Sequence, residues 1–248
     1  MPPSSSPTAL ITGSARRIGA EIARHLHSEG YRVIIHCRHS RDEGEALVAS
    51  LNQTRPDSAS SIQADLSDMP QVSVLSEQIT AEFGDIHLLV NNASSFYPTP
   101  LGESSQQQWD NLINSNLRAA YFLTQSLSPG LIRNNGAVVN LVDVHSQRGL
   151  PDYPIYSIAK AGVEMMVKVL AKDLAPNVRI NGVSPGPILW PEAEAALSDA
   201  AKDEIMKKTP LRRSGNPKDI ADAVYFLAHA PFITGQVLAV DGGRSLFS

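Results

Sequence analysis

Two residues with ionisable side chains, Tyr156 and Lys160, lie four positions apart in a segment whose apolar residues follow a helical pattern. Side chains at this spacing share one face of a helix, so the phenol and the ammonium group can approach each other. A tyrosine beside a lysine can take part in proton transfer. Asp143 lies thirteen residues before Tyr156, after an apolar run, and offers a carboxyl group. Alternatively, the pair is an exposed helical pair and Asp143 caps the turn after its strand.

A glycine-containing turn follows the first apolar run of the chain. Its sequence, Thr12-Gly-Ser-Ala-Arg-Arg-Ile-Gly19, leads directly into an amphipathic segment. Such a turn directs backbone N–H groups and the positive end of a helix dipole toward one place, which suits a pyrophosphate. The turn therefore predicts a dinucleotide ligand.

The end of the second apolar run indicates which dinucleotide binds. The sequence there is His36-Cys-Arg-His-Ser40, without an acidic residue. Folds that prefer NAD place Asp or Glu near this point for the ribose 2′-hydroxyl, whereas an arginine accommodates a 2′-phosphate. We therefore expect NADPH, with Arg38 and Ser40 at its 2′-phosphate. We also expect a contribution from His36, and we place Arg17 near the pyrophosphate and the substrate.

The elements that must position these residues alternate along the chain. Seven short apolar runs, interpreted as strands, are separated by longer amphipathic segments, interpreted as helices. This alternation predicts a single doubly wound α/β (Rossmann) domain over 8–248, with a parallel seven-stranded sheet, helices on both faces and a loose tail over 1–7. Ligands of such sheets bind outside the carboxyl ends of the strands. The expected strands span 8–12, 32–36, 61–64, 87–91, 137–141, 179–183 and 237–240, and the expected helices span about 19–29, 43–53, 70–83, 106–127, 156–174 and 217–228.

The composition limits the function. The 248 residues are 42% hydrophobic and 19% charged, which fits a globular domain and excludes a disordered or fibrous protein. A net charge of −4 without a basic cluster argues against nucleic-acid binding. The single cysteine, Cys37, allows neither an internal disulfide nor a cysteine-rich zinc site, and we expect no metal. The N-terminus resembles neither a signal peptide nor a membrane span, so we expect a cytoplasmic protein that binds no membrane.

Several motifs together resemble the short-chain dehydrogenases/reductases. In chain order they are Thr12-Gly-x-x-x-Arg17-Ile-Gly19, Asn91-Asn92-Ala93, Asn116, Tyr156-x-x-x-Lys160 and Pro185-Gly186, and the resemblance covers nearly the whole chain. Departures from the usual pattern are similar to the pteridine reductases of that family. Arg17 and Ser94 stand where the family commonly has glycine, and Asp143 stands where it has serine. Ser146 is a nearby serine, but its distance from Tyr156 is wrong for the usual role.

The resemblance implies pterin reduction. In pteridine reductases, a phenylalanine matching Phe96 stacks on a flat pterin held against the nicotinamide ring, and a serine matching Ser94 contacts the ligand. Stacking suits a planar heterocycle. Reduction of a ring C=N bond also needs a proton on nitrogen, which an acid beside a tyrosine can help to deliver. Phe96 could instead be a loop anchor packed on the core.

The resemblance also assigns roles around the cofactor. Lys160 would hold the ribose hydroxyls and lower the pKa of Tyr156. Asn116 would bend its helix and support a water molecule near Lys160, with Asn114 as a competitor for that role. The implied catalytic residues are Asp143, Tyr156 and Lys160, and the implied substrate-binding residues are Arg17, Ser94, Phe96, Asp143 and Tyr156. The implied cofactor-binding residues are Gly13, Arg17, Ile18, His36, Arg38, Ser40, Asp65, Leu66, Asn92, Ala93, Asn116, Tyr156, Lys160, Pro185, Gly186 and Ile188.

The main expectation is thus NADPH-dependent reduction of a dihydropterin, an oxidised pterin or dihydrofolate. A carbonyl or 3-oxoacyl thioester reductase is the alternative within the enzyme class, because a fold does not fix a function. A catalytically silent dinucleotide-binding regulatory module is the alternative from another class, and the intact Asp143, Tyr156 and Lys160 argue against it. The segment 187–208, with Trp190, is expected to cover the substrate. Residues 217–248 resemble the family region that builds a homotetramer.

Overall fold

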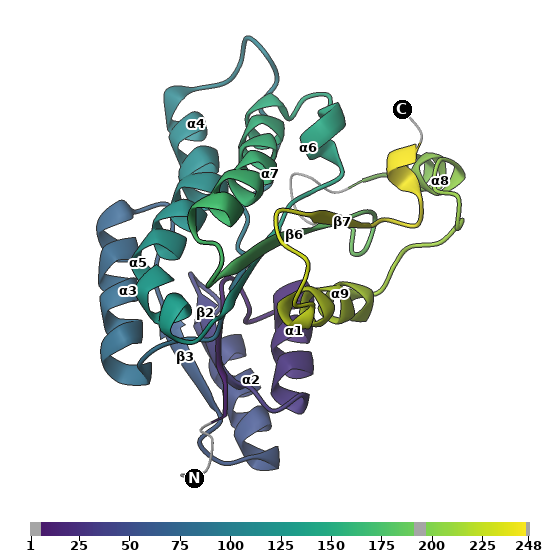
Figure 1. Cartoon of the computed structure of the whole chain (residues 1–248). Helices are drawn as coiled ribbons and strands as arrows, with labels where there is room; N and C mark the ends of the chain where they lie inside the picture. The colour runs from purple at the N-terminus through teal and green to yellow at the C-terminus, as the bar shows by residue number, and fades with distance from the viewer. Residues whose placement is uncertain (1–5, 191–196, 247–248) are drawn as a thin grey trace.

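Seven parallel strands form one sheet in the order β3-β2-β1-β4-β5-β6-β7 (Figure 1). The computed structural model describes residues 6–190 and 197–246, so most of the expected tail, part of the expected substrate loop and the last two residues lie outside the described residues. The predicted doubly wound α/β class is confirmed. The strands are β1 (Thr8–Ile11), β2 (Arg32–Cys37), β3 (Ala59–Gln63), β4 (Leu88–Asn91), β5 (Ala137–Leu141), β6 (Arg179–Pro185) and β7 (Val237–Val240).

Helices cover both faces of the sheet (Figure 1). Strand residues alternate between two apolar cores, so that Ile11 and Val90 pack into one core while Leu10 and Leu89 pack into the other. Because both faces are covered, the central strands β1 and β4 are buried along their whole length, whereas the edge strands β3 and β7 are partly exposed. One face carries α1 (Arg17–Ser28), α2 (Arg41–Thr54) and α9 (Pro217–His229), and the other carries α3 (Met69–Phe83), α5 (Ala119–Arg133) and α7 (Pro154–Asp173).

The helix expected over 106–127 is a composite of three helical segments. α4 (Gln106–Ile113) begins at a capping box between Ser105 and Gln108. It continues into a π-helical turn over Asn114–Arg118, and α5 then extends past the expected end. A π-helical turn changes the face on which the following side chains lie, and such turns are frequent at functional sites.

Two short helices have no counterpart among the sequence-based expectations. α6 (His145–Arg148) is too short to show a periodic pattern, and α8 (Asp199–Lys207) lies in the segment expected to cover the substrate. By contrast, the expected start of α9 is confirmed, because the side chain of Asn216 accepts the N–H of Lys218 and Pro217 occupies the first turn. Within the described ranges, no helix is long and apolar enough to cross a membrane.

Two glycines let the turn after β1 approach the chain that follows β4. Gly13 has a φ of +61°, and a Cβ atom there would lie 2.9 Å from the Cα of Ala93. A Cβ atom on Gly19 would lie 2.4 Å from the carbonyl oxygen of Gly13 and 2.6 Å from Nδ2 of Asn92. The spacing of these glycines therefore reflects close packing of the turn.

We expect Gly19→Ala to lower the free energy of unfolding by about 2 kcal/mol, because the new methyl group overlaps backbone atoms. Gly44→Ala, in the first turns of α2, is the matched control, since a Cβ atom there meets only side chains at 3.6 Å or more. Urea unfolding of both variants tests this, and equal stabilities would contradict the packing argument.

Candidate active site

A groove of about 490 Å³ opens at the carboxyl ends of β1 to β4. It lies at the point where the strand order reverses, which is the usual ligand site of such sheets. The structure brings many expected cofactor residues together there, namely Gly13, Arg17, Ile18, His36, Arg38, Ser40, Asp65, Leu66, Asn92 and Ala93. Ser94, expected at the substrate, and Gly19 of the glycine turn also line it. No role was expected for several other lining residues, among them Ala15, Arg16, Ser67 and Ser115.

The turn after β1 forms one wall of the groove and is held by the chain after β4. The side-chain amide of Asn92 donates to the carbonyl oxygens of Thr12 (2.8 Å) and Gly13 (2.9 Å). The backbone N–H groups of Asn92 and Ala93 donate in turn to the Thr12 hydroxyl. Among the described residues, no side chain caps the N-terminus of α1. Its first-turn N–H groups are therefore suited to an anion.

His36 supports this turn from β2. Its Nδ1 accepts the N–H of Gly13 at 3.0 Å, so its Nε2 carries the proton and donates to the carbonyl of Ala64 at 3.1 Å. Burial lowers the pKa of His36 to about 4, although the Ala64 carbonyl and Asp65 act in the opposite direction. The expected cofactor residue His36 is thus a neutral ring bonded to two backbone groups.

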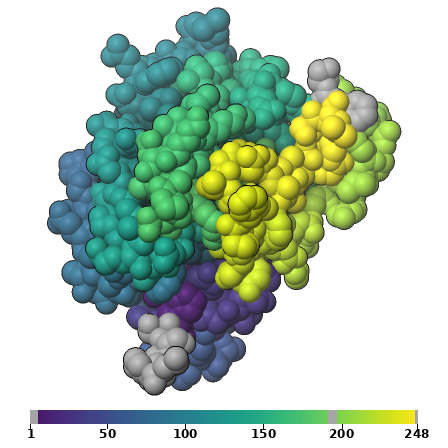
Figure 2. Space-filling view, viewed as in Figure 1, coloured from purple at the N-terminus to yellow at the C-terminus, as the bar shows by residue number. Residues whose placement is uncertain are grey.

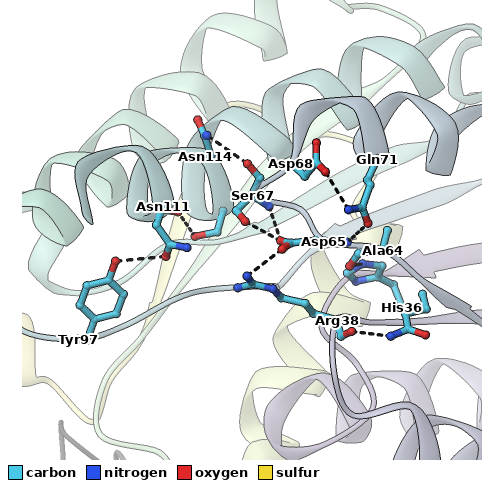
Figure 3. A network of polar contacts seen from close by, with 12 residues as sticks. His36, Arg38, Ala64, Asp65, Ser67, Asp68, Gln71, Tyr97, Asn111 and Asn114 are labelled. Atoms are coloured by element: carbon cyan, nitrogen blue, oxygen red, sulfur yellow. Dashed lines mark hydrogen bonds and ion pairs between the residues drawn. The ribbon is translucent and has the colours of Figure 1, made fainter. Parts of the chain in front are cut away.

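Arg38 and Asp65 form an ion pair across the mouth of the groove (Figure 3). Nη2 of Arg38 lies 2.8 Å from Oδ2 of Asp65. The other oxygen of Asp65 accepts the backbone N–H of Ser67 at 2.8 Å and its hydroxyl at 2.7 Å. Burial acts to raise the pKa of Asp65, but these hydrogen bonds and the arginine hold it below its usual value. The expected phosphate ligand Arg38 therefore already has an anionic neighbour.

The expected catalytic residues meet beside β5. The Tyr156 hydroxyl donates to Oδ2 of Asp143 at 2.8 Å, and Nζ of Lys160 donates to the carbonyl of Leu141 at 2.9 Å. The ammonium group lies 5.7 Å from the centre of the Tyr156 ring. The other oxygen of Asp143 accepts the N–H of His145 at 2.8 Å. Asp143 thus both caps the turn after its strand and binds the tyrosine.

Burial dominates the acidity of this group. It raises the pKa of Tyr156 well above the usual value, and the Asp143 carboxylate adds to the effect. It lowers the pKa of Lys160 to about 8, against the opposing effect of Asp143. Lys160 is not among the groups that shift this pKa, so the expectation that it lowers the pKa of Tyr156 stays a prediction. Tyr156 carries its proton and directs it toward Asp143.

The loop after β4 brings an aromatic ring to this group. Phe96 stacks on Tyr153 with ring centres 4.6 Å apart and meets Tyr156 edge-on at 4.8 Å. Phe96 thus packs against two tyrosine rings beside the candidate catalytic group, and its contact with a substrate stays a prediction. Tyr153 carries no motif of its own, so the sequence indicated at most that it borders the pocket and gave it no catalytic role.

Asn116 joins the same loop to the π-helical turn. Its Oδ1 accepts the Ser94 hydroxyl at 2.6 Å, while its Nδ2 donates to the carbonyls of Ser95 and Leu112, each at 3.0 Å. The helix irregularity that the resemblance implied at Asn116 is present. Asn114 has a separate contact, since its Nδ2 donates to the Ser67 carbonyl at 3.2 Å (Figure 3).

Comparisons with known proteins identify the family. A family model described as enoyl-(acyl carrier protein) reductase matches residues 13–245. The 3-oxoacyl-[acyl-carrier-protein] reductase FabG of Staphylococcus epidermidis is 36% identical over 240 residues, covering 95% of this chain and 98% of the relative. The chain belongs to the short-chain dehydrogenase/reductase family.

Two other relatives show the range of substrates within the family. Pteridine reductase 1 of Leishmania tarentolae is 34% identical over 283 aligned positions, covering 97% of each chain. The granaticin polyketide synthase putative ketoacyl reductase 2 of Streptomyces violaceoruber is 34% identical over 247 positions, also covering 97% of each. Membership of the short-chain dehydrogenases/reductases makes the protein an oxidoreductase and implies NAD(P)H as its cofactor.

Arg17 departs from the usual short-chain dehydrogenase/reductase pattern in an informative way. Its φ is +56°, in the left-handed region that glycine adopts without strain. An arginine there costs conformational energy of the kind found at functional positions. Its guanidinium donates to the carbonyl of Trp190 at 3.0 Å. Arg17 therefore links the glycine turn to the segment expected to cover the substrate.

The expected cofactor residues Pro185, Gly186 and Ile188 of this short-chain dehydrogenase/reductase, like Asn116, Tyr156 and Lys160, are not among the residues that line the groove. Pro185 ends β6, and Gly186 donates its N–H to the carbonyl of Val240 at 3.0 Å. Ile188 lines a separate hollow of about 350 Å³ beside the start of α9. Their contact with the cofactor stays a prediction. Within residues 6–190 and 197–246, no cluster of His, Cys, Asp and Glu is suited to a metal ion.

Acid should weaken the support given by His36. Folding lowers the pKa of His36 from 6.5 to about 4. Between pH 6.5 and pH 4, His36 is therefore protonated in the unfolded chain but neutral in the folded chain. The free energy of unfolding should therefore fall as the pH falls through this window, by at most about 1.4 kcal/mol per pH unit from this site. We expect a shallower dependence in His36→Asn when urea unfolding is measured from pH 7 to 4. His27 and His87, whose pKa values are also lowered by burial, titrate in both proteins. Equal slopes would contradict the assignment.

Proposed function

We propose that the protein reduces pterins with NADPH. One observation supports this most strongly: the Tyr156 hydroxyl is hydrogen-bonded to a carboxylate, Asp143, where the family usually has serine. A serine can orient a carbonyl oxygen, whereas a carboxyl group can also hold the proton that a ring nitrogen must receive. Phe96, beside Tyr156, supplies an aromatic face for a planar heterocycle.

The groove fits the proposed cofactor. Arg16, Arg17 and Arg38 line it together with the uncapped first turn of α1, so cationic groups and backbone N–H groups converge where phosphates would bind. Arg38 and Ser40 suit a 2′-phosphate, and in this proposal Lys160 would hold the ribose hydroxyls. NADPH, when bound, supplies a hydride to the substrate carbon.

The chain supplies the proton. Reduction of a C=N bond adds hydride to carbon and a proton to nitrogen, so one proton must leave the protein in each turnover. The Tyr156 hydroxyl carries that proton, its oxygen lies 2.8 Å from Oδ2 of Asp143, and the pair can release the proton toward the substrate nitrogen. The Lys160 ammonium group, bonded to Leu141, stabilises the negative charge that remains. Bulk water then restores the proton.

Reduction of a 3-oxoacyl thioester is the second candidate. The comparisons favour it over pterin reduction, because relatives at 36% identity are described as 3-oxoacyl-[acyl-carrier-protein] reductases and the pteridine reductase is 34% identical. Tyr156 and Lys160 would serve a carbonyl oxygen equally well. Asp143 and Phe96 are the residues that favour the pterin.

NADPH consumption should be measured with dihydrobiopterin, dihydrofolate and an acetoacetyl thioester, and repeated with NADH. We expect turnover of the pterins with NADPH preferred, and Asp143→Ser should slow pterin reduction by about 10²-fold while affecting a carbonyl substrate less. Tyr156→Phe is the control, and it should slow the reduction of every substrate. Turnover of the thioester alone would support the second candidate and make the pterin assignment wrong. An equal effect of Asp143→Ser on both bond types would remove the basis for choosing the pterin.

We also propose a homotetramer built from one domain over 8–248. Exposed apolar side chains gather at two places, with Tyr121, Phe122, Met165 and Val169 on α5 and α7, and Phe226, Phe232 and Leu238 at α9 and β7. Figure 2 shows α5 in teal and α7 in green side by side on one face. Two separate apolar faces suit an assembly with two kinds of contact. Light scattering should give the mass of four chains, and a monomer would overturn the proposal. Cytoplasmic residence stays a prediction.

A further inference from the structure

A third polar side chain continues the row that Tyr156 and Lys160 begin on α7. Glu164 follows Lys160 at the same spacing of four, so the three side chains lie along one face of the helix. The Glu164 side chain is only 11% exposed, although a carboxylate is rarely buried without partners. The proposed reaction gives it no part.

Glu164 binds two consecutive residues of α6. Its Oε2 accepts the Ser146 hydroxyl at 2.8 Å, and its Oε1 accepts Nε2 of Gln147 at 3.0 Å. Lys168, one turn further along α7, donates to the same Oε1 at 3.0 Å from the solvent side. Burial acts to raise the pKa of Glu164, but the bonds from Ser146, Lys168 and Gln147 hold it below its usual value. The group is therefore an ionised clamp between α7 and α6.

α6 cannot hold its own position. It has four residues, and so short a helix has almost no stability in isolation. It ends at Gly149, whose φ of +70° reverses the chain. Hydrogen bonds to other elements must therefore fix it, and the carboxylate of Glu164 provides two of them.

The position of α6 determines the orientation of Asp143. Oδ1 of Asp143 accepts the N–H of His145, and its backbone carbonyl accepts the N–H of Ser146 at 3.0 Å. These bonds leave Oδ2 directed at the Tyr156 hydroxyl. A shift of α6 would rotate or release the carboxylate of Asp143 and lengthen its bond to Tyr156.

We propose that Glu164 is a positioning residue for the reaction. By clamping Ser146 and Gln147 it keeps α6 against α7, and so keeps Asp143 on Tyr156. This inference rests on the proposed role of Asp143. It also explains Ser146, whose hydroxyl is engaged by Glu164 and does not replace the usual family serine.

A double-mutant cycle tests the proposal on the full-length protein. The substrate is whichever of the pterins, dihydrofolate and the acetoacetyl thioester supports NADPH consumption. We expect E164Q to lower kcat about tenfold, which is the effect of weakening one hydrogen bond to a charged group, with the KM for NADPH within about twofold of wild type. S146A should lower kcat in the same direction by less. K168M removes the remaining partner of Glu164 without touching α6 and should stay within about twofold of wild type.

The decisive comparison is E164Q in the D143N background. If Glu164 acts through Asp143, adding E164Q to D143N should change kcat by less than about twofold. Full additivity, or wild-type kcat in both E164Q and S146A, would overturn the positioning role while D143N remained impaired. Wild-type activity of D143N would instead overturn the proposed role of Asp143 and the inference with it. S146A loses one hydroxyl of a partly exposed helix, so it keeps the test valid if E164Q fails to fold.

Discussion

The close approach of the turn after β1 to the chain after β4 is the constraint on which the site depends. Two glycines make the approach sterically feasible, and the amide of Asn92 holds the carbonyls of Thr12 and Gly13. The wall of the groove and the first turn of α1 are placed by this contact. The loop that carries Ser94 and Phe96 begins at the same point, so the cofactor groove and the aromatic surface share one anchor.

The second part of the site is assembled from the other half of the sheet. Asp143 follows β5, and Tyr156 projects from α7, which packs on the face of the sheet that also carries α3 and α5. Asn116 joins the π-helical turn to the loop after β4, because its side chain bonds Ser94 and Ser95 of that loop. Several polar side chains of the site, among them His36, Asn92 and Lys160, are thus bonded to backbone atoms of another element. Such support keeps reactive groups in a fixed geometry.

The fold class could be predicted because buried parallel strands are apolar and their spacing is regular. The glycine turn and the spacing of Tyr156 and Lys160 could also be predicted, because both depend on residues that are close together in the sequence. The role of Asn92 could not be predicted, because its partners lie about eighty positions away and are backbone atoms. Nor could the ion pair of Arg38, whose partner Asp65 follows a different strand. The pattern Asp65-x-Ser67 does predict the local turn in which the Asp65 carboxylate accepts the backbone N–H of Ser67. The acidity of Tyr156 depends on burial, which no motif encodes.

The ion pair between Arg38 and Asp65 changes how cofactor choice must be understood. A solvent-exposed guanidinium without an ion-pair partner gains one when a phosphate binds. Arg38 already pairs with Asp65, so it would have to give up this ion pair or share its N–H groups between Asp65 and the phosphate. A phosphate bound here would bring negative charge close to Asp65, whose remaining bonds to Ser67 would then have to carry more of its stabilisation. With the cofactor phosphate at Arg38, as proposed, discrimination between two dinucleotides would be a competition between two anions for one cation, and Asp65 would determine selectivity together with Arg38.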